Sequence, residues 1–109
     1  MHKSLKFAPN LVPLVLSWEK TTTWRLFDEK DLQAGDILDF IEQANWNVFA
    51  HAIITSMQEK QLQGLQDDDY AGHERFESEE RMYKTYRGYY GDRVTPETLV
   101  KIIWFDIIE

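Results

Sequence analysis

A short stretch near residue 20 holds a lysine, a threonine and an arginine at spacings that suit acyl-transfer chemistry. Residues 21–27 are rich in β-branched and aromatic side chains, a composition that predicts a strand. Side chains alternate along a strand, so Thr23 and Arg25 share one face, and Lys20 can turn toward it from the preceding junction. A threonine hydroxyl is a weak nucleophile that needs a base, and a lysine is a base only when burial or a nearby cation keeps it neutral. Spacing alone favours a plainer alternative, a strand end with solvated Lys20 and Arg25.

Local patterning predicts the elements that would position these residues. We expect an edge strand at 6–8, a helix over 11–18 capped by Asn10 with Pro13 in its first turn, and the strand 21–27. Further strands are expected at 37–41 and 48–57, joined by a turn at 45–47, then a short helix near 62–65. A helix from a Ser78 cap to Tyr90, stopped by Gly91, precedes a last strand at 100–108. Along this strand Ile102, Trp104 and Asp106 fall on one face and Ile103, Phe105 and Ile107 on the other. This order predicts a single α+β domain over 1–109, with a small β-barrel or curled sheet and flanking helices.

The composition excludes several kinds of site. The chain has no cysteine, which removes disulfides, thiolate metal sites and cysteine nucleophiles. Its three histidines, His2, His51 and His73, lack the spacing of a zinc-protease helix, so we expect neither a metal nor a cofactor. The longest aliphatic run, 11–16, contains a proline and is too short to span a bilayer, so a cytoplasmic protein without membrane contact is expected. A net charge of −7 disfavours a protein that grips long nucleic acid.

The segment 81–93 interleaves basic residues with tyrosines. On a helix, Tyr83, Tyr86 and Tyr90 fall near one face, while Arg81 and Lys84 fall near another. One interpretation is a platform on which bases stack; the other, which we favour, is a helix packed by its tyrosines with its charges in water.

The sequence as a whole resembles the ASCH domain family, whose members have a PUA-like barrel and a cleft suited to RNA or nucleosides. The resemblance is carried by Phe7 to Asn10, Leu14 to Arg25, Gly35-Asp36, the segment 72–76, the segment 86–91 and the strand 100–105. The family signature has a glycine two residues before the lysine and an arginine at the far end of the strand. Lys20 and Arg25 match it, whereas Trp18 stands at the glycine position.

The resemblance also implies an activity. Some small ASCH proteins are amidohydrolases that cleave N4-acetylcytidine to cytidine and acetate with a lysine, a threonine three residues on and a later glutamate. These roles fall on Lys20, Thr23 and Glu74, with Glu77 as the alternative glutamate. Candidate substrate-binding residues are Arg25, Phe7, Trp18 and Tyr89.

Three functions therefore remain open. The favoured one is an amidohydrolase acting on N4-acylated cytosine nucleosides, with the nucleoside as its small-molecule partner. The second is an RNA-binding or RNA-processing module without deacylase activity, and the third is a regulatory domain that senses a nucleotide. The oligomeric state is not predicted.

Overall fold

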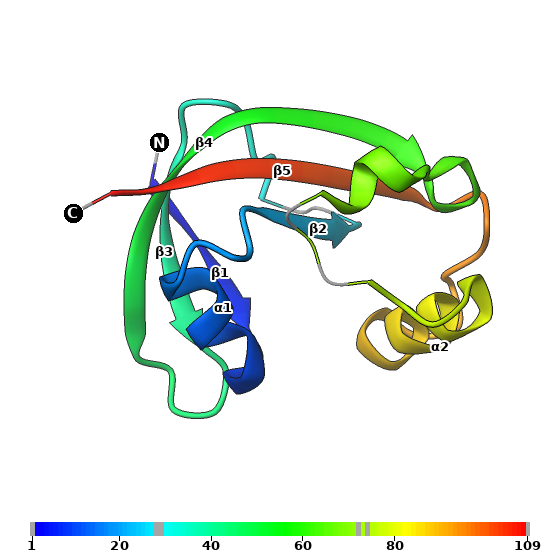
Figure 1. The fold of residues 1–109 in the computed structure, drawn as a ribbon, viewed down its shortest axis with the longest axis horizontal. Helices are drawn as coiled ribbons and strands as arrows, with labels where there is room; N and C mark the ends of the chain where they lie inside the picture. Colours follow the sequence, from blue (N-terminus) through cyan, green and yellow to red (C-terminus); the bar gives the residue numbers. More distant parts are fainter. Residues whose placement is uncertain (1, 28–29, 72, 74, 109) are drawn as a thin grey trace.

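The computed structural model of the protein describes residues 2–27, 30–71, 73 and 75–108. Five strands form one sheet: β1 (His2–Phe7), β2 (Thr22–Leu26), β3 (Ile37–Glu42), β4 (Val48–Gln61) and β5 (Leu99–Ile108). Their spatial order is β1-β3-β4-β5-β2, so β1 and β2 are the two edges. β1 and β3 are parallel and the other neighbours are antiparallel. The sheet curls into a half-barrel, which confirms the α+β class predicted from the sequence (Figure 1).

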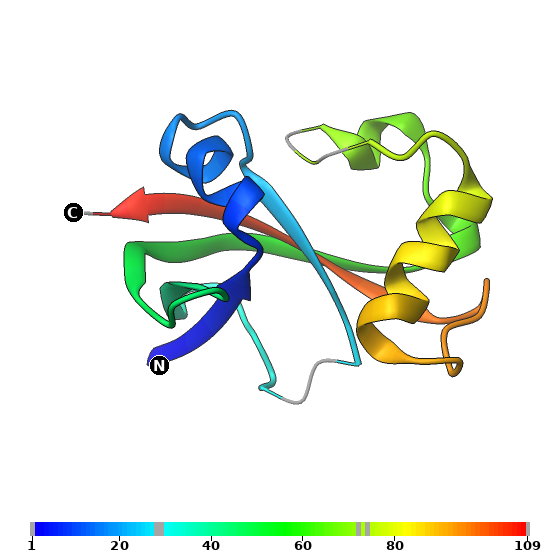
Figure 2. The ribbon, with the colours of Figure 1, turned by 90° about the horizontal axis from the view of Figure 1, so that it is seen from below.

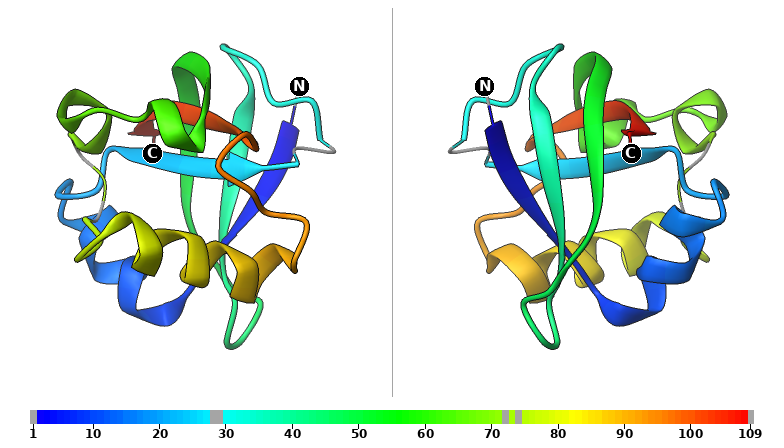
Figure 3. Two further views of the ribbon diagram at one scale, coloured as in Figure 1. Left: turned by 90° about the vertical axis from the view of Figure 1, so that its right-hand side faces the viewer. Right: turned by 90° about the vertical axis from the view of Figure 1, so that its left-hand side faces the viewer.

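The two edge strands approach each other at the open side of the half-barrel (Figure 3). A side chain spans this seam, because an Arg25 guanidinium nitrogen donates to the Lys6 carbonyl at 3.0 Å. We call this junction of β1 and β2 the seam.

Short helices and one long helix flank the sheet. They are the 3-10 helices η1 (Pro9–Leu11), η2 (Leu62–Gly64) and η3 (Asp67–Tyr70), and the α-helices α1 (Val12–Leu16) and α2 (Glu79–Tyr90). No helix in the described ranges is long and apolar enough to cross a membrane. α1 and α2 lie at opposite ends of β2, and both lie below β5 in the view of Figure 1 (Figures 1 and 2).

The ends of α2 agree with the sequence prediction, whereas the start of α1 does not. Ser78 accepts a hydrogen bond from the Arg81 N–H at 3.2 Å, and α2 ends at Gly91, whose φ of 90° favours glycine. The predicted Asn10 cap is wrong, because Asn10 lies inside η1. Pro9 fixes φ at a helical value, so helical structure begins at Pro9, two residues earlier than predicted, and no side chain caps it.

Two hydrophobic cores occupy the two faces of the sheet, and β5 contributes to both. Ile103 and Phe105 pack in one core with β1 and β3, while Val100 and Ile102 pack in the other with Trp24 and α2. This alternation was predicted for the last strand. β4 runs four residues beyond the predicted end at Met57, because its exposed, polar end still pairs with β5 through Gln61 and Leu99.

An ion pair ties β1 to the loop before β3. The Lys3 ammonium donates to an Asp36 carboxylate oxygen at 2.8 Å, and the Gln33 N–H donates to the same oxygen at 2.9 Å. These two hydrogen bonds, the one from Lys3 first, lower the pKa of Asp36 to about 2.

Candidate functional site

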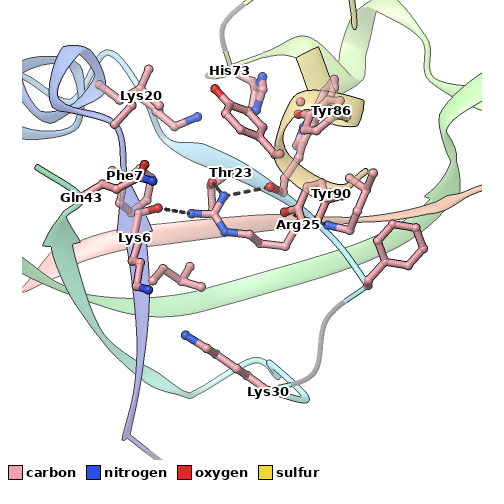
Figure 4. A pocket seen from close by; sticks show the side chains of 18 of the residues that line it. Lys6, Phe7, Lys20, Thr23, Arg25, Lys30, Gln43, His73, Tyr86 and Tyr90 are labelled. Carbon is pink, nitrogen blue, oxygen red and sulfur yellow. Dashed lines mark hydrogen bonds between the residues drawn. The ribbon is translucent and has the colours of Figure 1, made fainter. Parts of the chain in front are cut away.

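A cavity of about 650 Å³ opens along the free edge of β2, between β1 with η1 on one side and α2 on the other (Figure 4). Its volume lies within the range of small-molecule sites. Its lining includes Lys6, Phe7, Lys20, Thr23, Trp24, Arg25, Lys30, Gln43, His73, Tyr86, Tyr89, Tyr90 and Arg93.

A left-handed turn delivers Lys20 to this cavity. α1 ends as the Ser17 N–H donates to the Pro13 carbonyl at 2.9 Å, and Trp18 then adopts a φ of 67°. The chain folds back so that the Lys20 N–H donates to the Leu14 carbonyl at 3.0 Å. Lys20 is only 3% exposed, and its side chain extends into the cavity (Figure 4). The left-handed conformation explains the glycine at the position of Trp18 in the family signature, since glycine adopts it without strain.

Thr23 and Arg25 interact directly, as their shared strand face predicts. Arg25 donates from Nη1 to Thr23 Oγ1 at 2.6 Å and to the Trp24 carbonyl at 2.8 Å. Its guanidinium also lies over the Phe7 ring, 5.1 Å from the centroid. Thr23 is 1% exposed, and its oxygen already accepts a hydrogen bond, so its own proton can be given to a different group.

The main chain of β2 offers a further donor. The Thr21 carbonyl accepts a hydrogen bond from the Phe105 N–H at 3.3 Å. The main-chain N–H and C=O groups of odd-numbered residues in this segment therefore point toward β5. The main-chain groups of even-numbered residues point toward the free edge of β2, where the Leu26 N–H donates to the Tyr90 hydroxyl at 3.4 Å. By the same alternation the main-chain N–H of Trp24 points to the free edge, and within the described part of the chain its buried indole N–H has no acceptor. Both groups belong to a residue that lines the cavity.

Aromatic rings form the wall of the cavity nearest α2. The His73 ring stacks on Trp24, with centroids 4.0 Å apart and planes 13° apart. Thr22 holds the segment before His73 against β2 by donating to the Ala71 carbonyl at 3.4 Å. Tyr86 is buried and Tyr89 is 68% exposed, yet both line the cavity. Tyrosines of α2 therefore pack the second core, as the favoured interpretation predicts, and Tyr86 and Tyr89 also line the cavity, where stacking of a base on them stays a prediction.

The described lining of the cavity is rich in basic side chains. They are Lys6, Lys20, Arg25, Lys30 and Arg93, and no carboxylate is among the described lining residues. This contrasts with the net charge of −7 for the whole chain.

The structure gathers most of the residues expected at the site. Lys20, Thr23, Arg25, Phe7 and Tyr89 all line the cavity. Trp18 is not among the lining residues and is 58% exposed. Glu74 lies outside the described residues.

The alternative glutamate does not line the cavity. Glu77 is exposed and lies 3.7 Å from Arg81 on α2. Glu77 is also absent from the cavity lining.

Sequence reasoning did not place Lys6, Lys30 or Gln43 at the site, and it considered His73 only as a metal ligand. Lys6 and Lys30 reach the site because the two sheet edges meet at the seam, which no local pattern reveals. The position of His73 in the segment 72–76, which carries part of the family resemblance, could have indicated that it lies near the site.

Comparisons with known proteins identify the fold. No protein-family model and no curated protein matches the chain. Among solved structures, the hypothetical protein PH0355 is similar with a TM-score of 0.77 and 19% identity over 99% of this chain and 100% of that one. The ASCH domain from Lactobacillus crispatus JV V101 has a TM-score of 0.73 and 16% identity over 97% and 79% of the two chains. The ASCH protein from Zymomonas mobilis has a TM-score of 0.67 and 11% identity over 95% and 66%. The chain thus has the fold of ASCH domain proteins.

Proposed function

We propose that this protein is an amidohydrolase that removes the acyl group from N4-acetylcytidine or a related N4-acylated cytosine nucleoside. The observation that supports it most directly is the placement of a buried lysine and a buried threonine in one cavity beside aromatic rings. Lys20 and Thr23 are 3% and 1% exposed, respectively, yet both line the cavity. The ASCH fold is consistent with a site for RNA or nucleosides, which was the expectation from the resemblance.

The reaction adds one water across the amide bond. Thr23 Oγ1 attacks the acyl carbonyl, or holds the water that does so, and the proton lost by the attacking oxygen passes to the neutral amine of Lys20. The C–N bond then breaks, the exocyclic nitrogen leaves as the amine of cytidine after taking up a proton, and the acyl group leaves as a carboxylic acid. If an acyl-threonine forms, a second attack by water releases it.

Two groups on β2 are suited to stabilise the oxyanion. The Trp24 main-chain N–H follows Thr23 directly and faces the free edge, the position that serves as an oxyanion donor after the nucleophile of α/β-hydrolases. Arg25 supplies positive charge beside Thr23 Oγ1, at 2.6 Å. Glu74 keeps the role implied by the resemblance, in which it orients Lys20 or the leaving amine.

The aromatic wall suits a planar base. His73 and Trp24 present stacked rings, and Tyr89 is exposed at the mouth of the cavity. Stacking of a base on such rings contributes about 1–3 kcal/mol per base. A cytosine ring held there would bring its N4 substituent toward Thr23.

The test is a turnover assay with N4-acetylcytidine, followed by the ultraviolet change to cytidine. We expect Lys20→Met and Thr23→Val each to reduce kcat by about 100-fold or more, the usual effect of removing a base or nucleophile. Lys84→Met is the matched control, since Lys84 is exposed on α2 and does not line the cavity. Circular dichroism checks that the variants fold. Absence of turnover by the wild-type protein across several acyl lengths would refute the proposal.

A second candidate is an RNA-binding module without deacylase activity. It is favoured by the five cationic side chains that line the cavity. Binding to single-stranded RNA oligomers that weakens steeply with salt, together with no turnover of acylated cytidine, would establish this alternative.

A further inference from the structure

The turn after β3 brings a carboxamide to the cavity. Gln43 directly follows β3, and its main-chain N–H donates to the Phe7 carbonyl, at the end of β1, at 2.9 Å. The Phe7 ring lies against the Arg25 guanidinium, 5.1 Å from the ring centroid, and the same guanidinium contacts Thr23 Oγ1 at 2.6 Å. Gln43 and Phe7 lie next to each other on one side of the cavity in Figure 4. Gln43 is therefore anchored by its main chain close to the groups that surround the threonine.

The side chain of Gln43 is not used to hold the turn. Asn45 does so, because its carboxamide donates to a Glu42 carboxylate oxygen at 2.8 Å and accepts from the Asn47 N–H at 3.0 Å. The Gln43 carboxamide is exposed, lines the cavity and has no hydrogen-bond partner among the described residues. Its donor and its acceptor are therefore both open to a ligand.

A carboxamide forms hydrogen bonds that the cationic side chains of the lining cannot. Lysine and arginine only donate, whereas the carboxamide of glutamine presents a donor and an acceptor side by side in one plane. Gln43 is the one carboxamide among the described lining residues. An N4-acylated cytosine presents the complementary pair, because its N4–H donates and the adjacent ring atom N3 accepts. Glutamine pairs in the same two-bond manner with N6 and N7 of adenine in DNA.

We propose that Gln43 determines the specificity of the site for cytosine by pairing with N4–H and N3 of the acylated base. Its carbonyl oxygen accepts from N4–H, and its NH₂ group donates to N3. This inference rests on the proposed function, and it names the edge of the base that the site recognises. N4 carries both the proton that Gln43 binds and the acyl carbon that Thr23 attacks. The pairing therefore fixes the bond that breaks relative to the nucleophile.

The experiment compares N4-acetylcytidine with N4-acetyl-3-deazacytidine, in which a C–H group replaces ring N3. The two amides differ in intrinsic reactivity, so the quantity measured is the ratio of their kcat/KM values in each protein. We expect Gln43→Leu to lower this ratio by about 5-fold relative to the wild-type protein, because leucine leaves N3 without a donor while the analogue has no N3 to satisfy. Gln43→Glu keeps an acceptor for N4–H but places a carboxylate oxygen against the N3 lone pair. Its ratio should therefore be lower than that of Gln43→Leu.

The matched control is Gln58→Leu, since Gln58 is exposed on β4 and does not line the cavity. Its ratio should equal that of the wild-type protein, and circular dichroism checks that all variants fold. General damage to the site lowers kcat/KM for both substrates alike and leaves the ratio unchanged. An unchanged ratio in Gln43→Leu and Gln43→Glu therefore overturns the inference, even if both variants are slow.

Calorimetry separates this inference from the proposed activity. If the wild-type protein hydrolyses neither compound, the amidohydrolase proposal has failed, and binding of cytidine and 3-deazacytidine tests Gln43 alone, because cytidine presents the same N4–H and N3. Binding of cytidine that is about 5-fold tighter, with the advantage lost in Gln43→Leu, supports the role of Gln43. Equal binding of the two nucleosides, or binding of neither, overturns it.

Discussion

Replacement of Arg25 by methionine tests whether one side chain holds the seam closed. The guanidinium donates to Thr23 Oγ1, to the Trp24 carbonyl and to the Lys6 carbonyl, at 2.6, 2.8 and 3.0 Å. Methionine keeps much of the contact with Phe7 but donates no hydrogen bond. The substitution therefore leaves three acceptors without this donor and removes the bridge between β1 and β2.

The expected magnitude follows from these contacts. A hydrogen bond from a charged donor contributes about 1.5–3 kcal/mol when it is buried, and less beside an open cavity where water can replace the donor. With about 1 kcal/mol for each of the three bonds, Arg25→Met should lower the free energy of unfolding by about 2–4 kcal/mol. At about 4 °C for each kcal/mol in a domain of this size, the melting temperature should fall by about 8–16 °C.

Urea denaturation followed by tryptophan fluorescence measures the change. Arg81→Met is the matched control, because Arg81 is exposed on α2 and lies 3.7 Å from Glu77 in an exposed pair worth about 0–1 kcal/mol. Arg25→Lys should recover less than half of the loss, because a single ammonium cannot span the same acceptors. A loss below about 1 kcal/mol in Arg25→Met would show that the seam is held by other contacts and would refute the reasoning.

Three further predictions concern the backbone and one carboxylate. The free energy of unfolding of Trp18→Gly should exceed that of Trp18→Ala by about 1 kcal/mol, because both variants lose the exposed indole but only glycine is unstrained at a φ of 67°. Equal stabilities of the two variants in urea would contradict the left-handed conformation at residue 18. Gly91→Ala should destabilise by about 1–2 kcal/mol through its φ of 90° alone, since nothing lies within 4 Å of the added Cβ, and a thermal melt measures it. The pKa of Asp36 falls from 3.8 to about 2 on folding, so its contribution to stability is full above about pH 4 and is lost as the pH falls toward 2. The stability gap between the wild-type protein and Asp36→Asn should therefore narrow across that range, and a gap independent of pH would be the contrary result.

Features that depend on residues close together in the sequence, such as helix caps and strand faces, were predicted correctly. The Ser78 cap, the Gly91 stop, the two faces of β5 and the shared face of Thr23 and Arg25 all follow from a period of two residues or from cap chemistry. The prediction of an Asn10 cap was wrong because helical structure begins at Pro9, earlier than the apolar pattern indicated. The predicted end of β4 was wrong because its exposed polar end has no hydrophobic alternation by which a strand could be recognised.

Contacts across the seam could not be predicted from local sequence patterns. Lys6 and Lys30 join Thr23 only because a sheet with β1 and β2 at its edges curls until those edges meet. That curvature depends on the twist of all five strands together and on long-range pairing. The role of Arg25 in bridging the edges was missed for the same reason, although its presence at the site was predicted.

The pairing of β2 with β5 also sets when the site can form during synthesis. Thr23, which lies early in the chain, finds its hydrogen-bonding partner in Ile103, and the only sheet neighbour of β2 in the described structure is β5. While the ribosome is still translating the segment up to α2, β2 has no strand beside it and the threonine has no fixed position. A nascent chain stalled before Leu99 should therefore lack the site, even though β1, β3 and β4 could already have paired. Catalytic competence, under the proposed function, is acquired in the last stage of folding.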